Sequence, residues 1–259
     1  MKWLERSRCG LVVLLLLAGA QAQAGTLVVA AAISLREALQ GVVADYESTH
    51  PGERVELDLA ATGTLLQQLR AGAPIDLFLS ADETSMDQAA AAGLILRQTR
   101  RDFAGNTLVL IVPRRAPPLP GAGRPCALVG VSRLAIGDER SVPAGRYAQR
   151  LLEQQGCWSA LQTRLIRAEN VRQVLDEVAR GEVDAGFVYA SDTRIDADRI
   201  RVVRAYALQP PIRYPLALVS ASTHAAAARA FIGLLLARAG QASLQRQGFI
   251  VPGDAAWSR

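Results

Sequence analysis

Short apolar runs rich in Val, Ile and Leu alternate with longer segments of helical periodicity along most of the 259-residue chain. Short apolar runs bounded by turn signals are typical of β-strands, and apolar residues recurring three and four positions apart are typical of helices with one buried face. Leu35, Leu39, Val42 and Tyr46 form one such helical stripe. The predicted strands are Leu27–Ala31, Val55–Leu59, Asp76–Leu79, Leu108–Val112, Leu134–Ile136, Ala185–Tyr189, Ile200–Val203 and Tyr214–Val219.

This alternation predicts an α/β fold with mostly parallel sheets flanked by helices, in which ligands bind beyond the carboxyl ends of the strands. The segment Arg114–Pro125 is rich in Pro and Gly and indicates a loop near a break between two lobes. We therefore predict that residues 25–106 and 214–259 form lobe I and that residues 107–213 form lobe II. The final helices, predicted at Ala225–Ala239 and Gln241–Gln247, are expected to pack on lobe I.

The N-terminus has the three parts of a secretory signal peptide. Basic residues precede the apolar run Leu11–Ala20, and Ala22 and Ala24 supply the small residues that a signal peptidase requires. We predict that residues 1–24 are removed and that the mature chain is exported to the periplasm. Cys9 precedes the apolar run, so it cannot become the lipid-anchored first residue of a mature protein.

Charge and composition exclude several classes of partner. The chain carries a net charge of +5, part of it in the signal peptide, and its arginines are scattered without a basic run. This pattern argues against a nucleic-acid surface. Aromatic residues make up 5% of the chain, which disfavours a cleft that stacks sugars.

Cys126 and Cys157 are the cysteines that remain after processing. An oxidising compartment would allow them to pair, and their spacing matches no metal-binding pattern. We therefore prefer the interpretation that the two cysteines form a disulfide within lobe II over the interpretations of a reactive thiol or a zinc ligand.

Four predicted strand-to-helix turns carry small or hydroxyl residues: Ser34, Thr62, the turn Val142–Gly145, and Asn170 with Val171. The first N–H groups of a helix have no partner within the helix, so turns that meet in space would aim several donors at one point. Such a cluster of helix N-termini is an anion cradle.

Each turn also has a local interpretation. Ser34 alone could be the N-cap of the helix predicted at Leu35–Tyr46, and Asn170 with Gln173 resembles a capping box that leaves the Val171 N–H as the useful donor. Pro143 suits the first position of a helix, which leaves the N–H groups of Ala144 and Gly145 free.

Two further residues could supply hydroxyl donors. Thr62 and Gly63 precede the helix predicted at Thr64–Arg70, where the glycine allows a ligand to approach the backbone closely. Tyr189 ends a predicted strand, and a buried tyrosine hydroxyl needs a partner.

Catalysis is the competing class of function. His50 and His224 are the only histidines, and neither lies in a motif that would place it beside Ser34. No nucleophile elbow, P-loop, dinucleotide fingerprint or metal-ligand cluster is present in the sequence. Asp82 and Asp138 are interpreted as a helix cap and a turn residue. We therefore expect no enzymatic activity, no cofactor and no bare metal cation.

Five motifs follow one another across the mature chain: Ala30–Leu35, Gly72–Asp82, Gly105–Val109, Val142–Ala148 and Val188–Asp192. Together, and in this order, they resemble the periplasmic molybdate-binding proteins of bacterial molybdate ABC transporters. The resemblance implies a two-lobed, hinge-closing solute-binding fold of type II, with the oxyanion held between the lobes.

The resemblance also implies the ligands of the anion. Ser34 and Thr62 match two hydroxyl ligands, Tyr189 matches a tyrosine hydroxyl ligand, and Ala144 and Val171 match backbone donors. This sequence departs from the family at Ile33, which alters the turn before Ser34, and at Thr62, where a serine is usual and the extra methyl would narrow the cavity.

Neutral donors and helix N-termini can hold a tetrahedral dianion without a buried Arg or Lys. A set made only of donors rejects phosphate, which carries a proton that needs an acceptor. The predicted ligand is molybdate or tungstate, and the predicted partner is the permease of a molybdate ABC transporter. The chain itself is predicted to be a monomer. A binding protein for another small oxyanion such as sulfate, and an extracytoplasmic enzyme on a similar fold, stay open as alternatives.

Overall fold

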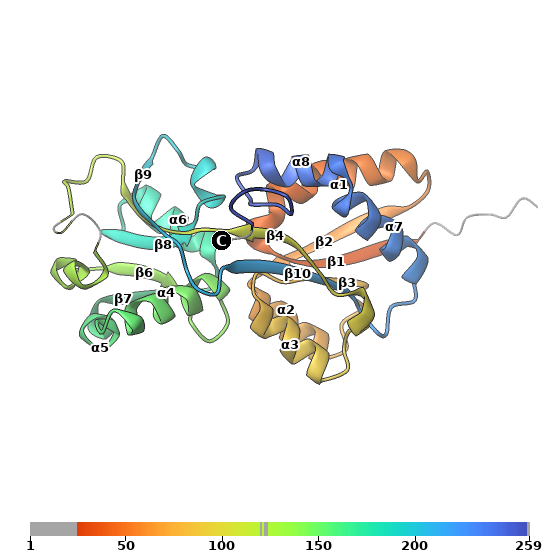
Figure 1. Ribbon diagram of the computed structural model, residues 1–259, viewed down its shortest axis with the longest axis horizontal. Helices are drawn as coiled ribbons and strands as arrows, with labels where there is room; N and C mark the ends of the chain where they lie inside the picture. Colours follow the sequence, from red (N-terminus) through yellow and green to blue (C-terminus); the bar gives the residue numbers. More distant parts are fainter. Residues whose placement is uncertain (1–24, 120, 122–123, 258–259) are drawn as a thin grey trace, which may run out of the picture.

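The computed structural model describes residues 25–119, 121 and 124–257, so the predicted signal peptide and Cys9 lie outside the described residues. Its strands form two five-stranded sheets. The first sheet has the order β2-β1-β3-β10-β4 and the second has the order β7-β6-β8-β5-β9 (Figure 1). Their bounds are β1 (Thr26–Ala32), β2 (Arg54–Ala60), β3 (Leu77–Leu79), β4 (Arg101–Asn106), β5 (Leu108–Pro113), β6 (Leu134–Gly137), β7 (Leu165–Ala168), β8 (Ala185–Tyr189), β9 (Ile200–Tyr206) and β10 (Ile212–Leu218).

Both sheets are mixed in the same way. In the first sheet β1 is parallel to β2 and β3, while β10 is antiparallel to β3 and β4. In the second sheet β6 is parallel to β7 and β8, while β5 is antiparallel to β8 and β9. One strand in each sheet therefore runs against the others, and the predicted two-lobed α/β fold is confirmed.

Helices cover both faces of each sheet (Figure 1). On the first sheet, α1 (Arg36–Thr49), α7 (Ala225–Leu236) and α8 (Arg238–Arg246) lie on one face, and α2 (Thr62–Arg70) and α3 (Glu83–Ala91) lie on the other. On the second sheet, α6 (Val171–Arg180) lies opposite α4 (Pro143–Gln154) and α5 (Trp158–Leu161). Short 3₁₀ turns are η1 (Ile33–Leu35), η2 (Arg97–Thr99), η4 (Pro125–Gly130), η5 (Gln162–Arg164) and η6 (Asp192–Arg194).

The strands that the sequence pattern did not predict are β4 and β7. β4 begins with the exposed pair Arg101 and Asp102, and β7 has an exposed arginine, Arg167, among only four residues. Short edge strands with charged residues lack the apolar run on which strand prediction rests. The predicted helix Ala225–Ala239 was too long, since α7 ends at Leu236 and α8 begins at Arg238.

The chain passes twice between the sheets, from β4 to β5 through Thr107 and from β9 to β10 through residues 207–211 (Figure 1). The division into lobes at residues 106/107 and 213/214 stays a prediction. We refer below to the parts built on the first and second sheets as lobe I and lobe II.

The disulfide that the sequence suggested is not formed, because Cys126 and Cys157 both carry free thiols. The Cys126 thiol donates a hydrogen bond to the carbonyl oxygen of Gln155, at 3.0 Å. Burial, reinforced by the neighbouring Cys126 thiol, raises the pKa of Cys157 to about 12. A thiol with so high a pKa is protonated near neutral pH and is a poor nucleophile for disulfide exchange.

Candidate functional site

The five residues predicted to hold a ligand lie together around one cavity. Ser34, Thr62, Ala144, Val171 and Tyr189 line a small space between the lobes, with about 210 Å³ of empty volume that is partly open to solvent. They lie at the carboxyl end of β1, at the starts of α2, α4 and α6, and at the end of β8. The remaining wall is made of small or apolar side chains, from Ala32, Ile33, Ala60, Ala61, Ala81, Val142 and Pro143. The role of the five residues as ligands is untested and stays a prediction.

Ser34 lies in η1 and is 4% exposed. Its hydroxyl makes no cap to α1, whose N-cap is Leu35, so the local interpretation of Ser34 as a helix cap is wrong. The Ser34 Oγ instead lies 3.1 Å from the hydroxyl of Tyr214, in β10.

Thr62 is the first residue of α2, which begins two residues earlier than the pattern predicted. Its fully buried Oγ1 accepts a hydrogen bond from the Ala81 N–H, at 3.1 Å. Because an N–H cannot accept, the hydroxyl hydrogen of Thr62 stays available to a third group.

Gly63 lies where the two lobes touch. Its N–H donates to the carbonyl oxygen of Ser141 at 2.9 Å, which joins α2 of lobe I to the turn before α4 of lobe II. A Cβ at residue 63 would lie 2.6 Å from that same oxygen. The close approach of the two segments therefore requires glycine at this position.

The two predicted backbone donors lie in the first turns of α4 and α6. Neither the Ala144 N–H nor the Val171 N–H has a hydrogen-bond partner among the described residues. Asn170 is the N-cap of α6, since its Oδ1 accepts from the Gln173 N–H at 3.0 Å, and the Gln173 side chain accepts from the Glu169 N–H at 2.9 Å. The capping interpretation of Asn170 is confirmed, and Val171 is left with a free donor at the positive end of the helix.

Tyr189 carries the most informative polar atom of the cavity. Its side chain is 1% exposed, and its hydroxyl has no hydrogen-bond partner in the described part of the chain. Burial raises the pKa of Tyr189 well above its usual value, so the hydroxyl keeps its proton. A buried hydroxyl without a partner costs about 1–3 kcal/mol, which a bound acceptor would recover.

Charged groups surround the cavity without lining it. Arg172, next to Val171, forms two hydrogen bonds of 2.9 and 3.0 Å with Glu37 across the lobes, and lies 3.9 Å from Asp192. Asp192 accepts the N–H of Tyr189 at 3.0 Å. Burial raises the pKa of this carboxyl to about 7, against the opposing effect of Arg172.

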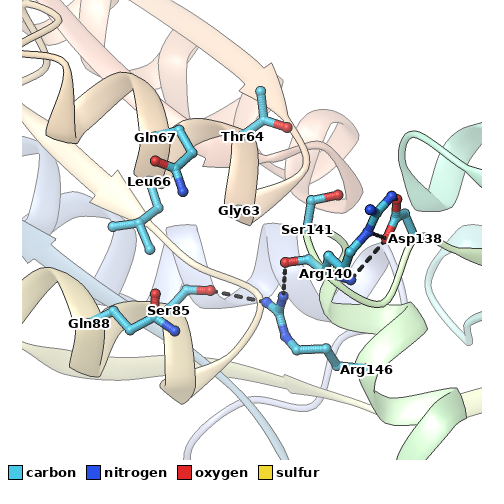
Figure 2. A pocket seen from close by; sticks show the side chains of 10 residues that line it. All are labelled: Gly63, Thr64, Leu66, Gln67, Ser85, Gln88, Asp138, Arg140, Ser141 and Arg146. Carbon is cyan, nitrogen blue, oxygen red and sulfur yellow. Dashed lines mark hydrogen bonds and ion pairs between the residues drawn. The ribbon is translucent and has the colours of Figure 1, made fainter.

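A wider hollow opens on the same seam between the lobes, with about 940 Å³ of empty space (Figure 2). Residues of α2 and α3 form one side, and the segment from Asp138 to Arg146 forms the other. Arg146 reaches across from α4: its guanidinium donates to Asp82 through Nε, at 2.9 Å, and to the Ser85 hydroxyl at 3.0 Å. We call this space the outer hollow and the space around Tyr189 the inner cavity.

The acidic and histidine residues weighed as catalytic candidates have structural partners. Asp82 caps α3 by accepting the Ser85 N–H at 2.9 Å, and Asp138 accepts from the Arg140 backbone and side chain. Hydrogen bonds from Arg140 lower the pKa of Asp138 to about 2. His50 stacks on Tyr46, and His224 lies 3.3 Å from Asp76, both away from the inner cavity. No group of three or more potential metal ligands occurs within residues 25–119, 121 and 124–257.

The chain matches the model of a family described as bacterial extracellular solute-binding protein over residues 27–250. The molybdate-binding protein ModA of Escherichia coli K12 is 32% identical over 256 residues, which cover 96% of this chain and 98% of the relative. The chain belongs to the ModA family. ModA of Haemophilus influenzae is also 32% identical, over 85% of this chain and 87% of that relative.

Solved structures agree on the fold of this ModA family member. The periplasmic molybdate-binding protein of Azotobacter vinelandii matches with a TM-score of 0.75 at 23% identity, over 87% of this chain and 99% of that one. The sulfate-binding protein SubI of Mycobacterium tuberculosis matches with a TM-score of 0.76 at 17% identity, over 90% and 89% of the two chains. At these identities the likeness shows the two-lobed fold alone. None of the helices in the described part of the chain has the length and apolar character needed to cross a bilayer.

The sequence did not predict the residues that form hydrogen bonds to Ser34 and its neighbours from outside the inner cavity. Tyr214 was assigned only to a strand, and Asn106 only to a motif of the family resemblance, although both contact the group around Ser34. Their roles depend on pairing between segments more than a hundred residues apart, and no local pattern reports such pairing. The interlobe contacts of Arg146 and Arg172 were missed for the same reason.

Proposed function

We propose that this protein captures molybdate or tungstate in the inner cavity and delivers it to the permease of an ABC transporter. Membership in the ModA family supports the ligand and the transport role. The observation that carries the proposal is the buried Tyr189 hydroxyl, which has no partner in the described residues and faces a cavity with two other hydroxyls.

The donor set fits a fully deprotonated tetrahedral anion. The hydroxyls of Ser34, Thr62 and Tyr189 and the N–H groups of Ala144 and Val171 are all donors or can act as donors. Oriented N–H and O–H dipoles at helix N-termini replace the hydration that the anion loses. No charged side chain lines the inner cavity, so its size and the predominance of donors would set the selectivity.

The same residues support a binding role over a catalytic one. Among the described residues that line the inner cavity, no nucleophile is paired with a base. Burial keeps the Tyr189 hydroxyl protonated. We therefore propose a monomeric, non-enzymatic protein that needs no cofactor and acts in the periplasm after removal of residues 1–24.

Calorimetric titration of the mature protein with molybdate and with tungstate tests the proposal. We expect one anion bound per chain and no turnover of the anion. Lack of binding by both anions would overturn the proposed function. If sulfate alone bound, the fold-level likeness to a sulfate-binding protein would extend to the ligand, and the assignment of molybdate would be wrong.

A further inference from the structure

Asn106, the last residue of β4, has an amide whose orientation is fixed by its neighbours. Its Oδ1 accepts the Thr107 N–H at 2.9 Å and lies 3.5 Å from the Ser191 N–H. Because both of these groups are donors, the oxygen of the amide must face them. The Nδ2 group then faces the Ser191 Oγ, at 2.8 Å, and the Tyr214 Oη, at 3.4 Å.

This orientation decides the direction of the next hydrogen bond. The Tyr214 Oη accepts from Asn106 and lies 3.1 Å from the Ser34 Oγ, where either atom could donate. Tyr214 is fully buried, and Ser34 is the one described residue to which its hydroxyl can give its hydrogen. If Ser34 donated to Tyr214 instead, the tyrosine hydrogen would be left without an acceptor, at a cost comparable to a lost hydrogen bond.

We propose that Asn106 and Tyr214 are positioning residues of the oxyanion site, which act through Ser34. Asn106 donates to Tyr214, Tyr214 donates to Ser34, and the Ser34 hydrogen is thereby directed into the inner cavity. This inference rests on the proposed function, because it assumes that the anion is the acceptor of that hydrogen. Under this proposal, Ser34 donates to the anion because of a hydrogen-bond chain of three side chains, from η1, β4 and β10.

The arrangement also links the site to a crossing between the lobes. Asn106 ends the strand that leads into lobe II through Thr107, and its partner Ser191 follows β8 of lobe II. Two hydroxyls of the site are then oriented by groups behind them, Ser34 by Tyr214 and Thr62 by the Ala81 N–H, while the Tyr189 hydroxyl has no partner among the described residues.

A double-mutant cycle on the mature protein tests the proposal. Molybdate affinity is measured by calorimetry for the parent, Ser34→Ala, Tyr214→Phe and the double variant. We expect Tyr214→Phe to weaken binding roughly three- to tenfold in the parent. In the Ser34→Ala background the same change should weaken binding less than twofold, since the residue through which Tyr214 acts is gone. Tyr46→Phe is the matched control: it removes a tyrosine oxygen bonded to Glu53, outside the lining of the inner cavity, and should leave the affinity unchanged.

Asn106→Asp gives an independent reading if Tyr214→Phe does not fold. A carboxylate accepts, so it reverses the chain and draws the Tyr214 and Ser34 hydrogens away from the anion. Affinity lost through repulsion between the new carboxylate and the anion would also be lost in the Ser34→Ala background. Affinity lost because the hydrogen-bond chain is reversed would not be, since Ser34 is absent there. The cycle therefore separates repulsion from reversal.

Equal weakening by Tyr214→Phe, or by Asn106→Asp, in both backgrounds would show that these residues do not act through Ser34 and would overturn the inference while leaving the proposed function intact. Affinity within twofold of the parent in Tyr214→Phe would do the same. A parent protein that binds neither molybdate nor tungstate would overturn the proposed function and this inference with it.

Discussion

The inner cavity and the outer hollow lie on the same seam between the lobes but have opposite chemistry. The inner cavity is small and lined by hydroxyls, small apolar side chains and helix starts, with no charged side chain. The outer hollow is several times larger and includes Arg140 and Arg146 (Figure 2). Both arginines are already paired with carboxylates, Arg140 with Asp138 and Arg146 with Asp82.

This difference separates two tasks. Charged side chains join segments of the protein, as Arg146 and Arg172 do across the lobes. Within the inner cavity, the groups left without partners among the described residues are neutral donors: the Tyr189 hydroxyl and the N–H groups of Ala144 and Val171. An unpaired arginine there would attract any anion, whereas neutral donors in a small cavity discriminate by shape and by protonation.

The largest expected effect comes from removing a hydroxyl of the inner cavity. Ser34→Ala and Tyr189→Phe should each weaken molybdate binding by about 1.5–3 kcal/mol, roughly ten- to a hundredfold, because each hydroxyl faces a charged acceptor. Calorimetric titration measures the loss.

The stability of these variants sharpens the test. Tyr189→Phe should not lower the free energy of unfolding of the ligand-free protein, because its hydroxyl has no partner to lose among the described residues. Tyr46→Phe, the matched control, should lower stability and leave binding unchanged, because it breaks a hydrogen bond to Glu53. If Tyr189→Phe bound molybdate like the parent, Tyr189 would be a core residue and no ligand.

Gly63→Ala tests whether the inner cavity depends on close contact between the lobes. The added Cβ would meet the Ser141 carbonyl oxygen at 2.6 Å, so we expect binding to weaken by about 1–2 kcal/mol, near tenfold. Gly233→Ala, in α7, is the control because a Cβ there meets nothing within 4 Å. Equal affinity of the two variants would show that the lobes bind the anion without this contact.

Arg146→Met tests the outer hollow, where the Arg146 guanidinium joins lobe II to Asp82 of lobe I. Methionine keeps much of the apolar stem and removes the interlobe pair with Asp82, so binding should weaken a few-fold, by about 1 kcal/mol. Arg140→Met is the control, since Arg140 is exposed and pairs with Asp138 in its own turn. A loss above a hundredfold in Arg146→Met would place this arginine at the ligand and contradict the division of tasks.

The last prediction concerns the pH dependence of stability and depends on Asp192, behind Tyr189. Its folded-state pKa of about 7 lies above the usual carboxyl value, so the native state holds this proton more tightly than the unfolded chain. Its contribution to the free energy of unfolding should therefore fall as pH rises from about 4 to 7. Unfolding curves of the parent and Asp192→Asn measure this, and identical pH profiles would show that the carboxyl titrates normally.

The residues that line the inner cavity could be predicted from the sequence, whereas the residues that hydrogen-bond to them from outside the cavity could not. Ser34, Thr62, Ala144 and Val171 could be located because strand-to-helix turns are local patterns, and parallel strands bring their carboxyl ends to one edge. Tyr189 could be located because it ends a buried strand. The hydrogen-bond chain through Asn106 and Tyr214 could not, because it joins residues 180 and 108 positions apart.

The elements that failed had weak local signals. β4 and β7 are short and carry charged residues, and the disulfide between Cys126 and Cys157 was inferred from compartment and count, without geometry. Composition can permit a disulfide, but the positions of the two thiols decide whether it forms.

Competition between anions tests the donor-only character of the inner cavity most directly. Sulfate and phosphate are similar in size and shape, but near neutral pH phosphate keeps a proton that requires an acceptor. Molybdate-loaded protein is challenged at pH 7 with equal excesses of sulfate and of phosphate, and the released molybdate is measured. We predict that phosphate displaces less molybdate than sulfate does. Measurable displacement by phosphate that equals or exceeds displacement by sulfate would show that the site accommodates the phosphate proton and would contradict the account.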